Sequence, residues 1–183
     1  MRDDELAIAL VAAQQGQAWA LRAVYDHLAP RVCGYLRSRG ADEPDDLTSE
    51  VFLAVFPRLA TVTGGAAGLR TLVFSVAHAR LVDERRRRAR REPTVEYDPG
   101  TDTRCAPSSE DEALALIATD RTQALLAVLP DDQRDVLVLR IVSDLSVEQV
   151  AEVIGRSPGA VKQLQRRGLL ALRAHLQQRR AVL

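Results

Sequence analysis

The sequence predicts an all-α protein made of two small helical domains joined by a flexible acidic linker. Alanine, leucine and arginine dominate the chain, aromatic residues make up only 4% of it, and such a composition favours helices. No run of alternating β-branched residues indicates a strand. Residues 92–108 are polar and acidic, contain proline and have few apolar side chains, which predicts a segment without a core. The expected domains are therefore 1–91 and 109–183.

The first two helices are expected over about Asp4–Gln15 and Gln17–Arg39, each followed by a glycine, Gly16 or Gly40. Pro30 interrupts the backbone bonding of the second helix and predicts a kink there. Apolar residues recur near helical spacing along this second segment and predict its buried side: Trp19, Val24, Leu28, Val32, Tyr35 and Leu36.

A third helix is expected to open at Pro44, since proline suits the first helical position. Asp45 and Asp46 then fall in the first turn, where the helix dipole favours negative charge. Its buried stripe comprises Leu47, Val51, Val55 and Leu59, which leaves an acidic patch with apolar neighbours elsewhere on the helix. A loop over 61–68 and a fourth helix from Leu69 into the arginine block 85–91 complete this half.

The second half contains two helices joined by a very short turn. Ser146 and Gln149 form an S-x-x-Q capping box that starts the first of them, and Gly155 ends it. Ser157 and Pro158 then repeat a helix-start signal. Helices joined this tightly cross steeply, which is the helix-turn-helix geometry that places the second helix in a DNA major groove.

The second of these helices is strongly basic, because no acidic residue follows Glu152. Side chains of this type bind phosphates and base edges. The predicted contacts to duplex DNA are Arg156, Ser157, Lys162, Gln163, Arg166 and Arg167. The alternative is an ordinary amphipathic C-terminal helix with a solvated charged face.

The chain carries 25 basic and 25 acidic residues, yet the basic ones form two separated blocks that could each hold a polyanion. No metal-ligand spacing, Gly-rich phosphate loop or nucleophile elbow indicates an enzyme, a cofactor or a small-molecule substrate. No signal peptide is evident, and the apolar run Leu6–Ala13 is too short to cross a bilayer. We therefore expect a cytoplasmic protein without membrane insertion.

Three segments in order resemble those of an extracytoplasmic-function (group 4) sigma factor of bacterial RNA polymerase. PDDLTSEVFLAVF is similar to the family's region 2.2, LRTLVFSVAHARLVDERRRR to regions 2.3 and 2.4, and LPDDQRDVLVLRIVSDLSVEQVAEVIGRSPGAVKQ to region 4. The resemblance covers nearly the whole chain. It implies an alternative sigma factor that binds core RNA polymerase through the beta-prime clamp and the beta flap and directs it to promoter DNA, with an anti-sigma factor as a further partner.

The resemblance also implies roles for individual residues. The clamp-binding positions would be Asp46, Leu47, Glu50, Val51 and Phe52. The contacts to the opened minus-ten element would be Arg70, Phe74, His78, Arg80, Arg85, Arg86, Arg87 and Arg88, and the basic helix after Ser157 would read the minus-thirty-five element. Leu72 and Ala79 depart from the family's common Trp and Asn, which puts the strength of promoter melting in doubt.

Two other functions stay open at this point. A stand-alone helix-turn-helix regulator would share the basic helix but would need no polymerase. A degenerate, sigma-like interaction protein would bind polymerase without melting DNA. For the sigma factor, two weak DNA contacts on tethered domains are expected to become strong only when polymerase fixes their spacing.

Overall fold

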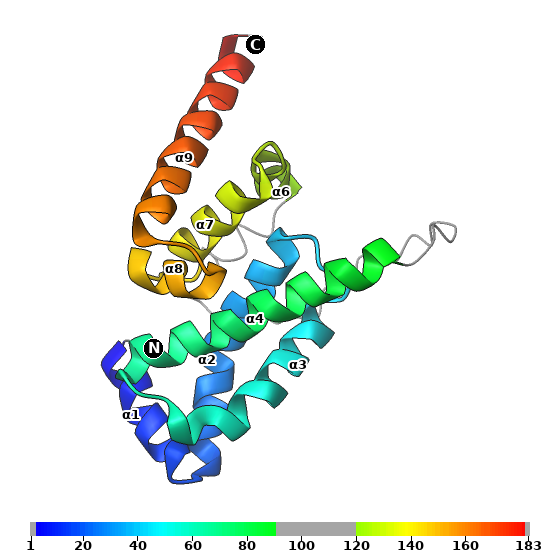
Figure 1. The fold of residues 1–183 in the computed structure, drawn as a ribbon. Helices are drawn as coiled ribbons and strands as arrows, with labels where there is room; N and C mark the ends of the chain where they lie inside the picture. The colour runs from blue at the N-terminus through cyan, green and yellow to red at the C-terminus, as the bar shows by residue number, and fades with distance from the viewer. Residues whose placement is uncertain (1–2, 91–119, 182–183) are drawn as a thin grey trace.

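The computed structural model describes residues 3–90 and 120–181, and this part of the chain is helical without any strand. The first half comprises α1 (Asp3–Gln14), α2 (Ala18–Ser38), α3 (Pro44–Val55), the short 3-10 helix η1 (Phe56–Thr61) and α4 (Gly65–Arg90). The second comprises α6 (Asp120–Ala127), α7 (Asp131–Ile141), α8 (Val147–Ile154) and α9 (Pro158–Ala181). The predicted all-α class is confirmed, and Figure 1 shows α9 projecting from the body.

The helix breaks of the first half lie where glycine predicted them. Gly16 and Gly40 adopt the left-handed φ values +77° and +74° two residues after the ends of α1 and α2, a conformation that glycine reaches without a steric cost. Pro30 lies inside α2, which continues through it to Ser38. Side chains from α1 to α4 meet in one core, which includes Leu6, Leu28, Val51 and Leu81.

The segment between α3 and α4 differs from the prediction. The expected loop over 61–68 is shorter, because η1 extends to Thr61 and α4 begins at Gly65 rather than Leu69. Gly64 and Gly65 both have positive φ and turn the chain into the helix early. Gly68 is needed there because a Cβ at its position would overlap the Thr63 carbonyl oxygen.

The local signals of the helix-turn-helix are confirmed. Ser146 Oγ accepts a bond from the Gln149 amide at 3.2 Å, and the Gln149 side chain accepts the Ser146 amide at 2.8 Å. Gly155 ends α8 with a left-handed φ of +65°. Ser157 Oγ accepts a bond from the Ala160 amide at 3.2 Å, which caps α9.

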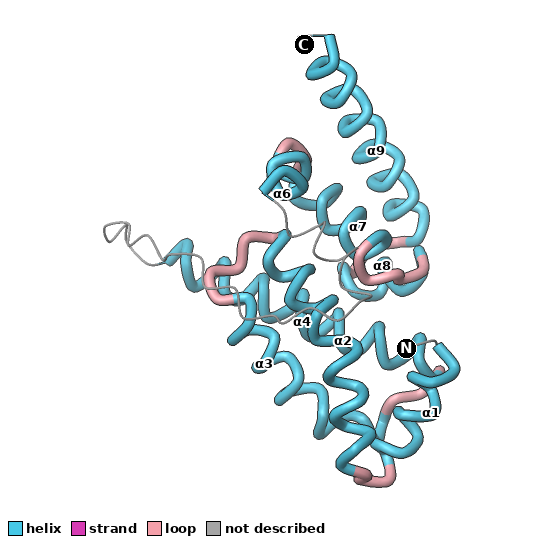
Figure 2. Tube along the Cα trace, turned by 180° about the vertical axis from the view of Figure 1, so that it is seen from behind, coloured by secondary structure: helices cyan, strands magenta, loops and turns pink. Residues whose placement is uncertain are grey.

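The two halves pack against each other. Helix α8 lies on α4, and α7 lies near the end of α2, as Figure 2 shows from behind. Gln149 Nε2 donates to Ala67 O at 2.8 Å and to Thr71 Oγ1 at 3.0 Å, and one continuous apolar core includes side chains of both halves. The sequence predicted two small domains joined by a linker, and in this structure their helices are in contact. The expected linker, 92–108, lies outside the described residues.

Candidate nucleic-acid interface

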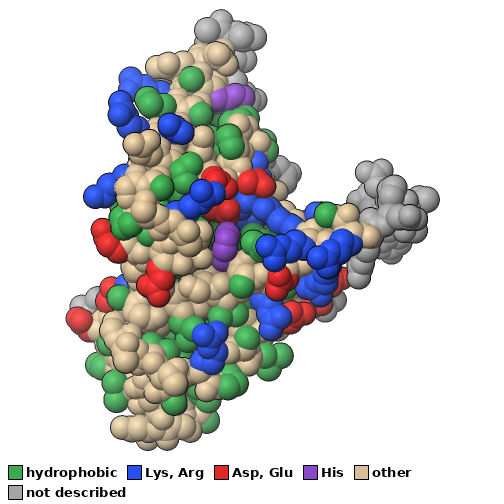
Figure 3. Space-filling model, in the orientation of Figure 1, with side chains coloured by type: hydrophobic (Ala, Val, Ile, Leu, Met, Phe, Trp, Pro, Cys, Tyr) green, Lys and Arg blue, Asp and Glu red, His purple; other side chains and the backbone are tan. Residues whose placement is uncertain are grey.

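The basic face of α9 is exposed along its first three turns. Lys162, Gln163, Arg166 and Arg167 are all accessible to solvent, whereas Val161 on the opposite side is fully buried. These four side chains and Leu170 line an open hollow of about 390 Å³. Figure 3 shows Lys and Arg side chains along this helix and at the far end of α4. The helix thus presents a row of donors to solvent, as the groove-reading prediction requires.

Two other residues of the predicted minus-thirty-five set already have partners. Arg156 Nη2 lies 2.9 Å from Asp132 Oδ2 in an exposed ion pair. Ser157 uses its hydroxyl to cap α9. Arg156 could exchange its carboxylate for a phosphate at little cost because an exposed pair contributes only about 0–1 kcal/mol.

The predicted minus-ten residues of α4 do not share one face. Arg70 is buried, and its Nη1 and Nη2 donate to the two carboxylate oxygens of Asp3 at 2.6 and 2.8 Å. This bonding lowers the pKa of the Asp3 carboxyl and raises that of Arg70. Phe74 is fully buried and meets the Tyr35 ring edge-on, with the centroids 6.0 Å apart. In this conformation neither side chain can reach a DNA base.

His78 and Arg85 lie between the two halves, in a group of polar side chains that we call the interhelix polar cluster. It comprises Tyr35 and Arg39 of the α2 end, His78 and Arg85 of α4, and Asp131 and Asp135 of α7. Arg39 has no exposed side-chain surface, and its Nε lies 2.5 Å from Asp135 Oδ1. Its Nη1 donates to Asp131 at 3.3 Å.

Arg85 extends the same cluster. Its Nη1 lies 3.4 Å from Asp131 Oδ2, and its Nη2 donates to the Arg39 carbonyl oxygen at 2.5 Å. His78 and Arg85 were predicted as site residues from the sequence, but their four partners were missed. The one signal in the sequence was the four-residue spacing of Asp131 and Asp135, which puts both carboxylates on one face of α7.

Hydrogen-bond roles in the cluster follow from the number of protons available. Tyr35 Oη lies 2.8 Å from His78 Nδ1 and 3.3 Å from Asp135 Oδ1. The carboxylate can only accept, so we assign the Tyr35 proton to Asp135 and a proton on His78 Nδ1 to Tyr35. Burial raises the pKa of Tyr35 well above its usual value, which keeps this donor protonated.

Lowering the pH is expected to weaken the folded state through His78. Burial lowers the pKa of His78 below its ordinary 6.5; nearby Arg39 and Arg85 lower it further, while Asp135 and Asp132 oppose them. As the pH falls, His78 is therefore protonated in the unfolded chain before it is protonated in the folded chain. The contribution of neutral His78 to the free energy of unfolding is fully present above about pH 6.5 and is lost as the pH falls through the lowered folded-state pKa.

Urea unfolding between about pH 7.5 and 5.5 measures this dependence. The wild-type chain should lose more free energy of unfolding over that range than a His78→Gln variant does, because the variant retains all other titrating groups. Equal losses in the two proteins would contradict the assignment.

The remaining arginines of α4 project from its C-terminal end. Arg86, Arg87 and Arg88 are accessible to solvent and Arg80 is half-buried. Arg88 forms an ion pair with Asp42, and Arg86 lies 3.8 Å from Asp83. These exposed pairs leave the side chains available to a stronger anion.

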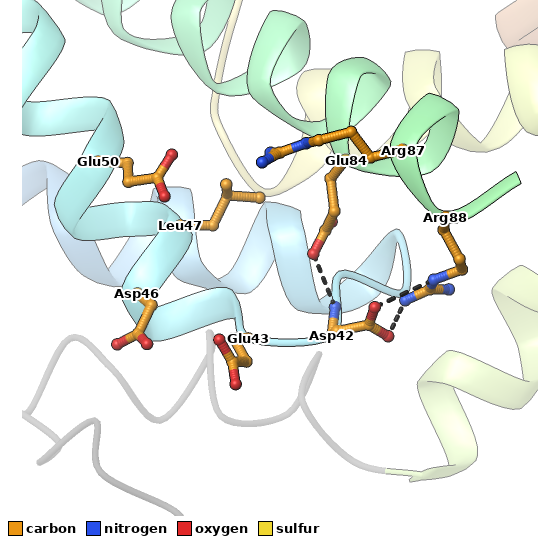
Figure 4. A pocket seen from close by; sticks show the side chains of 8 residues that line it. All are labelled: Asp42, Glu43, Asp46, Leu47, Glu50, Glu84, Arg87 and Arg88. Carbon is orange, nitrogen blue, oxygen red and sulfur yellow. Dashed lines mark hydrogen bonds and ion pairs between the residues drawn. The ribbon is translucent and has the colours of Figure 1, made fainter. Parts of the chain in front are cut away.

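The predicted clamp-binding residues divide into two kinds. Asp46 and Glu50 are exposed on α3, whereas Leu47, Val51 and Phe52 are buried and hold the helix onto the core. Figure 4 shows Asp46, Leu47 and Glu50 across a groove of about 350 Å³ from Glu84, Arg87 and Arg88 of α4. Burial raises the pKa of Glu84. The nearby carboxylates of Glu43 and Glu50 raise this pKa further, whereas Arg87 and Arg85 lower it. A cationic partner would relieve this crowding of carboxylates.

The described residues offer no sign of two other types of site. Residues 3–90 and 120–181 contain no group of three or more His, Cys, Asp or Glu side chains placed to hold a metal ion. Over the same residues, no helix is both long and apolar enough to cross a membrane.

The fold and the exposed basic helix define a DNA-binding protein of the helix-turn-helix class. Residues 125–174 match the family model described as Sigma-70, region 4. The chain is 35% identical to the ECF RNA polymerase sigma factor ShbA of Streptomyces griseus, over 97% of this chain and all of ShbA. It is 30% identical to the ECF RNA polymerase sigma factor SigD of Mycobacterium tuberculosis, over 94% of this chain and 84% of SigD. The chain belongs to the ECF RNA polymerase sigma factors.

A solved structure has the same fold. CnrH, in complex with the cytosolic domain of CnrY, is 22% identical and superimposes with a TM-score of 0.66, over 94% of this chain and 97% of CnrH. The resemblance predicted from the three sequence segments is thus confirmed at the level of the family. The roles of individual residues stay predictions.

Proposed function

We propose that this chain binds bacterial core RNA polymerase in the cytoplasm and directs it to promoters. The observation that carries the proposal is the exposed basic face of α9 on a correctly capped helix-turn-helix, in a chain similar to ShbA over the whole length of that protein. Residues 109–183 would read the minus-thirty-five element, and 1–91 would bind polymerase and the opened minus-ten element, joined by 92–108. The chain would supply binding and no catalysis.

Asp46 and Glu50 would contact the beta-prime clamp, and the buried Leu47, Val51 and Phe52 would fix the orientation of α3. On the DNA side, the exposed arginines at the end of α4 would track the phosphates of the opened strand. The beta flap would hold the second half, and an anti-sigma factor could compete for these surfaces.

A degenerate sigma-like protein is the second candidate. Leu72 and Ala79 replace the family's usual Trp and Asn, and Phe74, the only aromatic residue of α4, is buried. This helix therefore exposes no Phe, Tyr or Trp ring on which an extruded base could stack. Such a chain would bind polymerase without yielding transcripts.

Run-off transcription tests the proposal. Purified Streptomyces core polymerase is mixed with pooled genomic fragments, with and without the chain, and 5′ ends are mapped. New, discrete start sites support the sigma factor, polymerase binding without transcripts supports the degenerate protein, and tight duplex binding without polymerase supports a stand-alone regulator.

A double variant locates the minus-thirty-five contact. Lys162→Ala with Arg166→Ala should reduce promoter-dependent transcription by about 5- to 150-fold for each side chain that bonds to a base, which corresponds to about 1–3 kcal/mol. It should also flatten the salt dependence if phosphates are involved. Arg22→Ala is the control, since Arg22 is exposed on α2 and pairs with Asp26 within that helix. Equal activity of the double variant, the control and wild type would contradict the assignment.

A further inference from the structure

We propose that Lys162 of α9 is an acylation site for small donors that carry an activated acyl group on a phosphate-bearing leaving group, and that acylation weakens binding to the minus-thirty-five element. The effect on DNA binding rests on the proposed function, whereas the site itself does not. The type of residue, its exposure and its neighbours on α9 support the proposal.

Lys162 is chemically unlike every other basic side chain of the protein. The chain carries 25 lysine and arginine residues, and Lys162 is the only lysine among them. A guanidinium stays protonated in proteins, whereas the ε-amine of lysine is the group that acylation modifies. The sequence therefore offers one side-chain amine to an acyl donor. That amine belongs to the basic face of α9, where the loss of a charge affects DNA binding directly.

The amine is open to small molecules. Lys162 lies in the second turn of α9 and is exposed, whereas its neighbour Val161 is fully buried and holds the helix onto the core. The Lys162 side chain lines two open hollows on α9, of about 460 and 390 Å³. An acyl donor in solution can thus reach the amine without any movement of the fold.

Both hollows contain the two kinds of group that such a donor needs. Arg166, one helical turn after Lys162, borders both of them, and a guanidinium binds a phosphate through paired hydrogen bonds. Leu170 also borders both, and 55% of its surface is exposed, so that an apolar acyl group would find an apolar surface beside the amine. Figure 3 shows basic and hydrophobic side chains interleaved along this helix. A donor bound in this way is held near the amine, which accelerates the transfer.

The transfer exchanges one acyl bond for another. The neutral amine of Lys162 attacks the carbonyl carbon of the donor, and a C–N bond forms. The bond from that carbon to the phosphate oxygen, or to the sulfur of a thioester, breaks, and the leaving group takes the electron pair while the nitrogen loses a proton to water. The product is a neutral amide, so the basic face of α9 loses one positive charge.

Acetyl phosphate and acetyl-coenzyme A, each added alone to the purified full chain, test the site and distinguish the two sources of the acyl group. Peptide mass mapping measures the rate of acetylation at Lys162. Arg166→Gln should slow this rate by about threefold or more at low salt, where the guanidinium attracts the donor without screening. Arg22→Gln makes the same chemical change at an exposed ion pair on α2 and should leave the rate unchanged.

The donor that shows this difference is the source that the site accepts. Equal rates in wild type, Arg166→Gln and Arg22→Gln with both donors would overturn the site. Absence of acetylation at Lys162 with either donor would overturn it as well.

Run-off transcription measures the consequence for DNA binding. Complete acetylation should lower transcription by wild type by about fivefold or more, as expected for the loss of one base contact, or reduce the salt slope of promoter binding by about one if the contact is to a phosphate. Lys162→Arg, compared with its own untreated sample, should lose nothing on the same treatment. Equal losses in the two proteins, or neither change in fully acetylated wild type, would overturn this consequence. Absence of transcripts from both untreated proteins would instead contradict the proposed function, and the mass mapping would still decide the site.

Discussion

Replacing Phe74 by alanine is expected to lower the free energy of unfolding by about 3–5 kcal/mol, because it removes a large ring from a closely packed interior. Phe74 has no exposed surface. Its ring meets Tyr35 at an interplanar angle of 84°, the edge-to-face arrangement that aromatic pairs favour. Urea unfolding followed by far-UV circular dichroism measures the loss.

The control for this variant is Leu53→Ala. Leu53 lies on α3 with 73% of its surface exposed, so its truncation should change stability by no more than about 0.5 kcal/mol. If Phe74→Ala were as stable as wild type and failed only in promoter opening, the ring would act on DNA and would not be a structural part of the α4 core.

Much of the fold could be predicted because its signals are local. The start of α8 depends on Ser146 and Gln149, which are three residues apart, and its end depends on the backbone freedom of Gly155. The exposed basic face of α9 was likewise predictable, since charge and helical spacing can be read from the sequence along a single helix.

The burial of side chains on α4 could not be predicted in the same way. A helix that packs on one side shows a single apolar stripe, but α4 is covered both by the first half and by α8. Arg70 and Thr71 are therefore buried beside Phe74, although the family resemblance had placed Arg70 and Phe74 among the DNA contacts. The periodicity of one segment does not reveal how many neighbours cover it.

The interhelix polar cluster was beyond sequence reasoning for a related cause. Arg39 and Asp135 are 96 residues apart, and each is ordinary in its local sequence, one at the end of α2 and the other inside α7. Only the packing of the two halves turns them into a buried pair. Each residue matters because of the partner that it meets in the folded chain, and no local sequence motif identifies that partner.

Asp135→Leu is expected to uncouple the two halves of the chain. While the two halves stay packed together, it would leave Arg39 buried with only Asp131 as a carboxylate partner, and removing one member of a buried pair costs about 3–5 kcal/mol. Separation of the two halves avoids that cost because water then solvates the guanidinium. The fluorescence of Trp19, on α2, follows the first half alone, whereas circular dichroism follows all helices. Their urea transitions should coincide in wild type and separate in this variant.

Arg39→Met combined with Asp135→Leu should bring the two transitions back together. Two apolar side chains of similar volume leave no charge to solvate, and such replacements of buried pairs are often neutral or stabilising. Tyr35 would lose its carboxylate acceptor but could still bond to His78 Nδ1, 2.8 Å away. Separate transitions in the double variant would show that the ions are needed for the packing of the two halves. Coincident transitions in every variant would show that Arg39 and Asp135 do not couple the halves.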